Sequence, residues 1–502
     1  MSLASFSQIA STERRAASRA RWPVFAGACA IVAIAAAIQA RGGVNLDVAW
    51  FMTFAERVLQ GARAYIDVTD PNPPAAILVY LPAMLGAAWS GLNAEALVIG
   101  QTLGVAVVAC LAATSLERGA TRDRALIASL IALTIAPAAM FAEREHYAAL
   151  LATPACAVMM ALADGRSVSA LARLAAGAAA GAVVAFKPHF ATALLVPAFV
   201  ATLQRRSLRW IGWPEVLGFV ATLAAYGATI AIFFPAYLSD ALPDALAVYA
   251  AAHAPFASAL EMPTTWYMIA ATLIAATLAA RGALSAAARG AGWASVGFAV
   301  AYFTQQRYQI NHASSAIELA AIPMIEVLLA GRVASLLART LVMLAAALAP
   351  AFTLIQADLA QSMGAPDVVA VARKLMPPDG RLAAISDSME LTFPAARRIG
   401  GVWVNRHNSM WRYNTAKWIL DNRNPDAAET ARLNAVIATD RADLAEDISR
   451  GAPDVVMIES REVRLREMAS PRIAAALAPY RLAATVEGVE LWTRAPKTGP
   501  AK

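Results

Sequence analysis

Small groups of acidic, basic and histidine residues stand directly beside long apolar runs in this sequence. One group is the run 143–146 (Glu-Arg-Glu-His), and another is 187–189 (Lys-Pro-His). Ionisable side chains are costly to hold next to hydrocarbon unless they pair or bind something. Carboxylates beside cations suit a site where an acid removes a proton from a hydroxyl while Lys and Arg hold a phosphate, because each task needs its own sign of charge.

Further polar residues follow the same pattern of placement. They lie after the first apolar run or at the ends of later ones, and they include Asp47, Asp67, Asp70, Gln305, Gln306, Arg307, Asn311 and His312, with Glu318 one to two turns inside a run. For any one of these residues, the alternative to a functional role is a structural one, as an interfacial anchor or a member of a satisfied ion pair. We expect the whole set to face one membrane surface and to converge on one cavity.

The elements that must position these residues are apolar runs of a length that crosses about 30 Å of hydrocarbon as a helix. The sequence therefore predicts a polytopic α-helical membrane protein with about eleven transmembrane helices. We place them at 23–40, 95–116, 125–141, 147–163, 168–186, 188–204, 210–234, 265–280, 290–305, 309–330 and 333–355. The three cysteines all lie in apolar runs, so no disulfide framework is expected.

Lys and Arg are divided unevenly between alternate loops. Sixteen arginines lie in the N-terminal tail (1–22) and in the loops after even-numbered spans, whereas the opposite loops up to residue 355 hold six basic residues. Because basic loops stay in the cytoplasm, we expect an inner-membrane protein with a cytoplasmic N-terminus and a periplasmic C-terminus. We attribute the net charge of +7 to arginines that set the orientation in the membrane, and we expect no nucleic-acid partner.

Residues 41–94 form a large first periplasmic loop within the membrane module, 23–355. We expect two juxtamembrane helices there, at 48–60 and 75–90, the second opened by two prolines whose fixed φ suits a first helical turn. Counting 75–90 as a span would reverse the charge distribution of the later loops, so this segment is expected to lie in or dip into the outer face.

The composition changes beyond residue 356, where charged residues become frequent and apolar runs shorten to strand length. Strands are predicted at 381–386, 454–458, 481–486 and 489–493, with helices at about 366–376, 411–421, 426–437 and 441–450. We therefore expect a small periplasmic α/β domain over 356–502. Its segment 403–411 holds aromatic and polar residues that could stack on sugars or simply form the domain core.

Three motifs carry a family resemblance. The first is 45–47 (Asn-Leu-Asp), 55–67 and 70–74 (Asp-Pro-Asn-Pro-Pro); the second is the run 143–146; the third is Gly177 and Gly181 followed by 186–188 (Phe-Lys-Pro). In this order they resemble the GT-C superfamily of membrane glycosyltransferases. More narrowly, they resemble the protein O-mannosyltransferase and aminoarabinose transferase branch, which is glycosyltransferase family 39-like. The resemblance covers about residues 20–355.

The resemblance implies a glycosyltransferase, hexosyl- or pentosyl-, that moves a sugar from a polyprenyl-phosphate donor to a lipid, envelope polysaccharide or protein at the periplasmic face. By carry-over, the resemblance implies that Asp47 is the best candidate for the general base and that Glu145 is the second acidic residue of the catalytic site. The family's Lys before the proline pair is Asn72 here, so the donor phosphate depends on Arg63, Arg144, Lys187 or Arg307. The other residues expected in the cavity are Asp70, Asn72, Glu143, His146, His189, His312 and Glu318.

Other readings stay open at this point. A polytopic transporter predicts internal repeats and polar groups at mid-membrane, and an O-antigen ligase or polymerase predicts a large loop late in the chain. No nucleotide-phosphate motif is present in a strand-to-helix context, which favours a lipid-linked donor. We expect no metal and no required cofactor, with a divalent cation, Mg²⁺ or Ca²⁺, as the alternative way to neutralise the phosphate.

Overall fold

Ten of the eleven apolar runs form helices in the computed structural model, which describes residues 3–249, 251–331, 339–344 and 366–495. They correspond to α1 (Leu3–Gly42), α5 (Ala94–Thr114), α6 (Gly119–Leu130), α7 (Arg144–Ala163), α8 (Ala170–Phe186), α9 (Thr192–Arg205), α10 (Trp213–Phe233), α13 (Pro263–Ala280), α14 (Ala286–Gln305) and α15 (Ile310–Leu329). The eleventh run, 333–355, lies mostly outside the described residues. Among those described, six helices are long and apolar enough to cross a membrane, so a count of eleven crossings stays a prediction.

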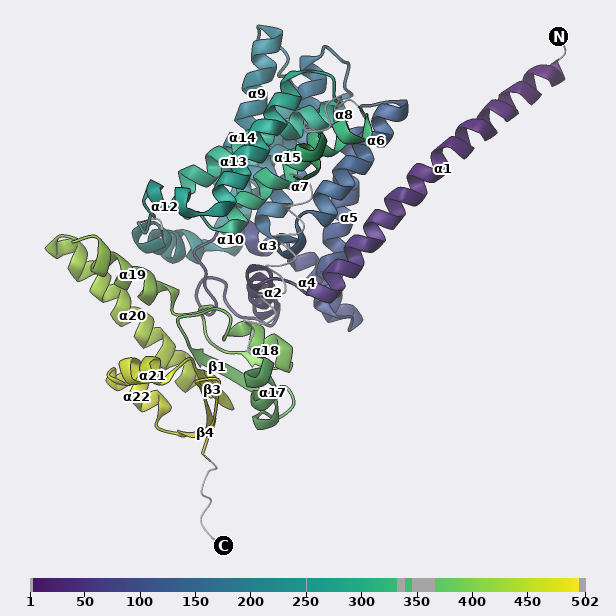
Figure 1. The fold of residues 1–502 in the computed structure, drawn as a ribbon. Helices are drawn as coiled ribbons and strands as arrows, with labels where there is room; N and C mark the ends of the chain where they lie inside the picture. The colour runs from purple at the N-terminus through teal and green to yellow at the C-terminus, as the bar shows by residue number, and fades with distance from the viewer. Residues whose placement is uncertain (1–2, 250, 332–338, 345–365, 496–502) are drawn as a thin grey trace. The chain divides into compact units, whose positions relative to one another are not determined.

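Residue contacts divide the chain into two units built from interleaved segments (Figure 1). Unit 1 comprises 1–44, 92–226 and 254–357, and unit 2 comprises 45–91, 227–253 and 358–502. The sequence prediction drew its boundaries along the chain, with 41–94 in the membrane module. In the structure, most of that loop packs instead with the C-terminal segment.

Small residues let the helices of unit 1 approach one another closely. A Cβ added at Gly290 of α14 would lie 2.6 Å from the backbone of Cys156 in α7, and one added at Gly218 of α10 would lie 2.1 Å from the carbonyl oxygen of Leu174 in α8. Such contacts are typical of membrane helices, where close packing replaces the hydrophobic effect. As a result, α7 is buried on nearly all sides at the centre of the unit.

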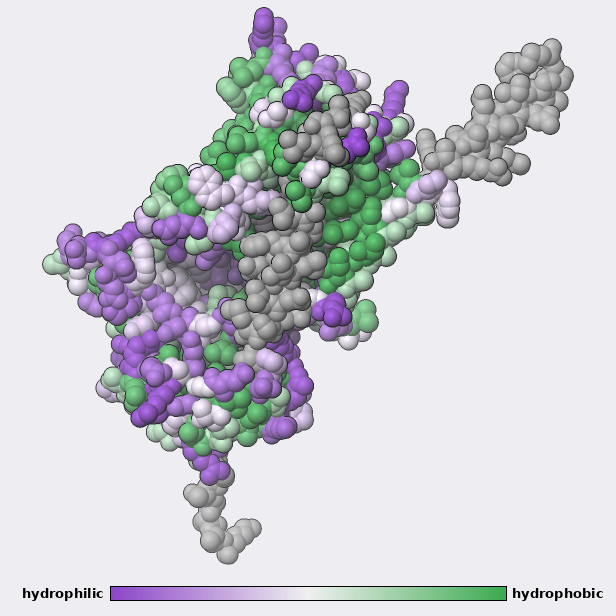
Figure 2. Space-filling view, in the orientation of Figure 1, coloured by the Kyte–Doolittle hydropathy of each residue, from purple (hydrophilic) through white to green (hydrophobic). Residues whose placement is uncertain are grey.

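The outer surface of unit 1 is apolar. Helix α10 is among the most hydrophobic helices of the protein, yet only 6% of its most apolar stretch is buried. Figure 2 shows apolar residues over much of the helical unit and hydrophilic residues over much of the part that contains the sheet. A helix that is apolar and exposed in this way is suited to contact lipid.

The end of unit 1 where α7 ends and α14 begins is held by ion pairs. Arg166 pairs with Glu117 at 2.8 Å, and Arg289 pairs with Asp164. Glu326 accepts the backbone N–H of Ser285 at 2.8 Å and also its hydroxyl. Glu326 therefore has a structural task at the start of α14.

The first outer loop contributes three helices to unit 2. Helix α2 (Leu46–Leu59) is capped by Asn45, whose side chain accepts the N–H of Val48 at 2.9 Å. The predicted helix 75–90 is divided by Val79 and Tyr80 into α3 (Ala75–Leu78) and α4 (Leu81–Ser90). A proline at the second position of α4 explains the division, because Pro82 has no N–H for a continuous helix.

The loop 235–264 contains short helical elements that the sequence did not predict. They are η4 (Tyr237–Ala241), α11 (Leu242–Asp244), η5 (Ala245–Tyr249) and α12 (Phe256–Glu261). The predicted span 125–141 is divided in the structure, where the end of α6 is followed by two short helical elements, η1 (Ile131–Ile135) and η2 (Ala138–Met140).

The C-terminal part of unit 2 contains a mixed five-stranded sheet in the order β2-β1-β3-β5-β4. The strands are β1 (Arg381–Ile385), β2 (Val402–Trp403), β3 (Val455–Ile458), β4 (Tyr480–Val486) and β5 (Val489–Arg494). Strands β1, β2 and β3 are parallel, and β5 is antiparallel to β3 and β4. The predicted β4–β5 turn has positive φ at Glu487 and Gly488, as a tight hairpin requires.

Six helices accompany the sheet: α17 (Pro366–Leu375), α18 (Phe393–Ile399), α19 (Trp411–Asn422), α20 (Ala427–Gly451), α21 (Arg461–Met468) and α22 (Pro471–Leu477). The predicted helices 426–437 and 441–450 are one helix, α20. The buried Asp440 lies inside it and accepts the N–H of Tyr413 at 3.2 Å. This correction follows from the absence of any Gly or Pro between 437 and 441.

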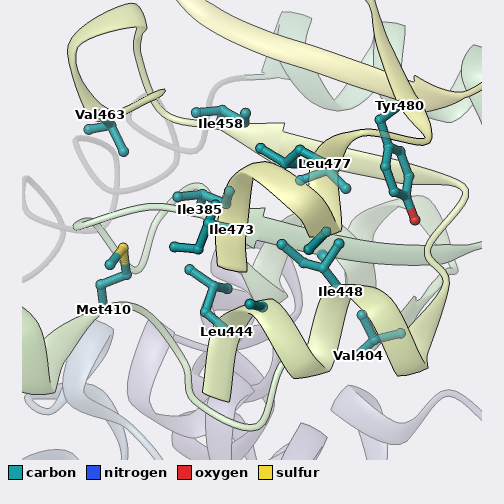
Figure 3. Packing of buried hydrophobic residues seen from close by; sticks show 14 of the residues in the cluster. Ile385, Val404, Met410, Leu444, Ile448, Ile458, Val463, Ile473, Leu477 and Tyr480 are labelled. Atoms are coloured by element: carbon teal, nitrogen blue, oxygen red, sulfur yellow. The ribbon is translucent and has the colours of Figure 1, made fainter. Parts of the chain in front are cut away.

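The core of this α/β region lies between the sheet and helices α20 and α22. Figure 3 shows Ile385 and Ile458 from the central strands beside Leu444, Ile448 and other aliphatic side chains. Strands β1 and β3 are buried on both faces over almost all of their length, as is usual for central parallel strands.

Candidate functional site

Three of the predicted site residues form a buried ionic cluster in unit 1. Lys187 Nζ donates a hydrogen bond to Oε1 of Glu145 at 2.6 Å. Arg144 Nε lies 3.6 Å from the other carboxylate oxygen of Glu145. All three side chains are at most 6% exposed. Two cations therefore share one carboxylate at the end of the helical unit.

Four helix ends meet around this cluster. Helices α7 and α15 begin there, at Arg144 and Ile310, while α8 and α14 end there, at Phe186 and Gln305. Lys187 precedes a proline and adopts an extended backbone with φ −152° and ψ 124°, which ends α8 and turns the chain into η3 (Pro188–Ala191). The starts of α7 and α15 add positive dipole ends, which favour negative charge nearby.

Histidines and a second carboxylate extend the cluster. His146 Nδ1 lies 3.0 Å from Oε2 of Glu318, and both side chains are at most 2% exposed. His312 Nε2 lies 3.1 Å from the side-chain nitrogen of Gln305. The hydroxyl of Ser315 donates to the backbone carbonyl of Glu145 at 2.7 Å, which fixes the first turn of α7 against α15.

Several buried polar atoms in the cluster have no hydrogen-bond partner among the described residues. They are Oε1 of Glu318, Nε2 of His146, Nδ1 of His312 and Nε2 of His189. Buried polar atoms are nearly always satisfied by protein, water or a ligand. The cluster can therefore accept further polar contacts.

The remaining predicted residues of unit 1 lie at the same end. Glu143 is the buried residue before α7, and Arg307 lies in the turn between α14 and α15. Gln306 and Tyr308, on either side of Arg307, have positive φ values of 52° and 51°. The structure thus brings together Glu143, Arg144, Glu145, His146, Lys187, His189, Arg307, His312 and Glu318 at one end of unit 1.

Four predicted residues belong to unit 2. Asp47 lies in the first turn of α2 and is half-buried. Asp70 is buried and accepts the indole N–H of Trp50 at 2.8 Å and the backbone N–H of Asn72 at 2.8 Å. Arg63 pairs with Asp67 at 2.9 Å. Asp70 and Asn72 therefore shape the loop before α3, and Arg63 is engaged locally.

Sequence reasoning missed Ser315 as part of the cluster and named Gln305 without a partner. Ser315 falls one turn after His312 on α15, so helical spacing from His312 was the available signal. Within the described ranges, no group of three or more His, Cys, Asp or Glu side chains is arranged to hold a metal ion.

Comparison with known proteins finds a similar fold at low sequence identity. No protein family and no curated protein sequence matches the chain. Among solved structures, it resembles the crystal structure of ArnT from Cupriavidus metallidurans bound to undecaprenyl phosphate, with a TM-score of 0.55 and 13% identity. The similarity covers 95% of this chain and 98% of that one. The resemblance that the sequence motifs indicated is therefore confirmed at the level of the fold, which is that of an ArnT-like membrane protein.

Proposed function

We propose that this protein is a glycosyltransferase that moves a sugar from a polyprenyl-phosphate donor to a hydroxyl of an acceptor at the periplasmic face of the inner membrane. The observation that carries the proposal is the buried cluster of Lys187, Arg144 and Glu145 at a helix-end junction. It is supported by the fold shared with ArnT, a protein crystallised with undecaprenyl phosphate.

Lys187 and Arg144 are the donor-phosphate ligands of this proposal. Both are held beside Glu145, and the two helix N-termini at this end favour a second anion. A phosphate that enters the cluster would take one or more cationic contacts from Glu145. Arg307, at the same end of the unit, is the third candidate cation. These side chains can neutralise the phosphate without a metal ion, so we propose metal-independent transfer.

Asp47 is the proposed general base. It takes the proton of the acceptor hydroxyl, whose oxygen attacks the anomeric carbon of the sugar. The bond from that carbon to the phosphate oxygen breaks, and the electron pair leaves with the polyprenyl phosphate. Attack opposite the leaving phosphate inverts the anomeric configuration. Glu145 stays ionised in this scheme and holds Lys187 in place through their 2.6 Å contact.

Donor consumption by the purified full-length protein tests the proposal. Defined polyprenyl-phosphate sugars, hexosyl and pentosyl, are supplied in detergent with extracts of envelope lipids, polysaccharide or protein as acceptors. We expect release of polyprenyl phosphate with at least one donor, with chelator having no effect. Absence of consumption with every donor, together with transport of a substrate across vesicles, would favour a transporter instead.

The Asp47→Asn variant tests the base. We expect its transfer rate to fall by about 10²- to 10⁴-fold, the usual contribution of a general base, with normal membrane insertion. Glu56→Gln is the matched control, because Glu56 is in the same helix and its half-exposed side chain pairs with Arg397 at 3.1 Å. Retained activity in Asp47→Asn removes Asp47 from this role.

A further inference from the structure

An arginine-rich pocket of about 300 Å³ lies entirely within unit 2. Its walls come from the last turn of α2 and the segment that follows it, from the start of β1, from β2 and the residues after it, and from the last turns of α20. Five arginines line it: Arg57, Arg63, Arg381, Arg406 and Arg450. None of them belongs to the cluster proposed to bind the donor phosphate.

Three carboxylates in the pocket wall neutralise only part of this charge. Arg406 pairs with Glu446 at 2.6 Å, with Asp447 at 3.0 Å and with Asp443, which lies outside the pocket lining, at 3.0 Å. Arg63 and Arg450 both contact Asp67, at 2.9 Å and 3.2 Å. Within the part of the chain that the structure describes, Arg57 and Arg381 form no ion pair with a carboxylate.

Arg57 is held by carbonyl groups instead. Its guanidinium donates to the carbonyl oxygen of Asn405 at 2.5 Å and to that of Asp67 at 2.8 Å. Burial lowers the pKa of Arg57, and the nearby carboxylates of Asp447 and Asp67 offset this only in part. A negatively charged ligand in the pocket would supply the counter-charge that the carbonyl groups do not give to the Arg57 guanidinium.

Two helix ends reduce the positive potential of the pocket. Helix α2 ends at Leu59 and α20 ends at Gly451, with Arg57 and Arg450 in their last turns. Each helix C-terminus acts as about half a negative charge. The charge that an anionic ligand would balance is therefore that of Arg57 and Arg381, the two arginines of the pocket that form no ion pair with a carboxylate among the described residues.

The pocket also has an apolar side. Ile66 and Val402 are both about 40% exposed and line it together with Trp403. Its volume is at the low end of the range of about 300 to 1,000 Å³ for small-molecule sites. Arginine forks bind carboxylate and phosphate groups in two-point contacts, while an apolar wall can cover the carbon face of a sugar ring.

We propose that this pocket binds an anionic saccharide of one or two sugar units that carries a carboxylate or a phosphate. The pocket shares no residue with the proposed donor site, and the inference does not depend on the glycosyl-transfer proposal. The anionic group contacts Arg57, Arg63 and Arg450, and the sugar ring lies against Ile66 and Val402.

Binding of small probes to the full-length protein in nanodiscs tests this site. Glucuronate and glucose-1-phosphate are compared with glucose and with inorganic phosphate by isothermal titration calorimetry. We expect one or both anionic sugars to bind at least about tenfold more tightly than either glucose or inorganic phosphate. The stronger of the two identifies the anionic group. Equal binding of inorganic phosphate, tighter binding of glucose, or no binding of either anionic sugar overturns the proposal.

Arg63→Gln and Arg450→Gln test the assignment to this pocket. Both side chains are about two-thirds exposed, so the fold should tolerate their replacement. Each change is expected to weaken binding of the anionic sugar by roughly tenfold, equivalent to about 1.4 kcal/mol. Arg432→Gln is the matched control. Arg432 is on the same helix as Arg450, α20, its side chain is about half exposed, and it lies outside the pocket. Unchanged binding in both pocket variants, or equal loss in the control, contradicts the assignment.

Discussion

Lys187 and Glu145 illustrate how a buried ion pair can serve a site at a cost to stability. Taking two charges out of water is expensive, and a well-packed apolar pair of similar volume is often as stable or more so. Removing one partner, in contrast, costs about 3 to 5 kcal/mol because it leaves a buried charge without compensation. The burial of this pair, with side chains 0% and 6% exposed, therefore supports the proposed role in phosphate binding.

Asp440 gives a test of the electrostatics of unit 2. Burial raises the pKa of this carboxyl, and the nearby His407 and Arg412 offset the rise only in part. A raised pKa in the folded state means that the stability from this group is fully present below its unfolded pKa of about 3.9. That contribution is lost as the pH rises through the folded pKa.

Asp440→Asn is therefore expected to stabilise α20 at pH 7, because the amide stays neutral and can still accept the N–H of Tyr413. Hydrogen–deuterium exchange of α19 and α20 in the full-length protein measures this, with variant and wild type compared at the same pH. Slower exchange in the variant at pH 7, with a smaller difference at pH 5, is the expected pattern. Faster exchange in the variant at pH 7 contradicts the charge assignment.

At the scale of elements, the contact between α8 and α10 depends on glycine. A Cβ at position 218 would lie 2.1 Å from the carbonyl oxygen of Leu174, so Gly218→Ala forces the two helices apart. We expect a loss of about 1 to 3 kcal/mol, the usual cost of overpacking, seen as a lower temperature for loss of monodisperse protein in detergent.

Gly227→Ala is the control on the same helix, because a Cβ there meets no atom within 4 Å. Alanine favours a helix over glycine by about 1 kcal/mol, so this variant should be at least as stable as wild type. Equal stability of the two variants would show that the close approach of α8 and α10 contributes nothing to the stability of the protein.

The sequence predicted elements well where one physical constraint dominates. Hydrocarbon thickness requires long apolar helices, and ten of the predicted runs are helical among the described residues. The Glu487-Gly488 hairpin was predictable because few residues adopt the necessary positive φ. Strand β2 was missed because two residues carry no periodic pattern, and the single helix α20 was predicted as two shorter helices.

The candidate site was predictable only in part. Polar residues at helix ends identified Arg144, Glu145 and Lys187, since few other positions in apolar runs carry charge. The arginine pocket was not predicted, because Arg57 meets Asn405 across 348 positions and no local pattern links the two. Pairings of that kind depend on the fold as a whole.

At the scale of the whole molecule, the uneven distribution of arginines predicts the orientation in the membrane. We expect a cytoplasmic N-terminus and a periplasmic C-terminal region. Single cysteines at two exposed sites test this in a background without Cys29, Cys110 and Cys156. A membrane-impermeant maleimide should label Arg472→Cys in intact spheroplasts and Arg209→Cys only after lysis. The reverse pattern would place the α/β region in the cytoplasm and remove the proposed periplasmic site.

The interleaving of the two units has a consequence for function. The first outer loop and the segment 227–253 pack with residues of the C-terminal region, so unit 2 is assembled from three separate parts of the chain. Asp47 belongs to this unit, whereas Lys187 and Glu145 belong to unit 1. Experiments on the proposed transfer should therefore use the full chain.

Binding of undecaprenyl phosphate to the full-length protein tests the central claim most directly. It is measured by native mass spectrometry on wild type, on Lys187→Met/Glu145→Gln, and on the control Arg289→Met/Asp164→Asn, which neutralises the ion pair at the opposite end of unit 1. Each double change removes one positive and one negative charge, so both variants keep the net charge of the wild type. We expect the first variant to bind at least about tenfold more weakly, because hydrogen bonds to charged groups contribute about 1.5 to 3 kcal/mol, and the control to bind like wild type. Wild-type binding in the first variant, or equal losses in both, would contradict the assignment of the donor phosphate to this cluster.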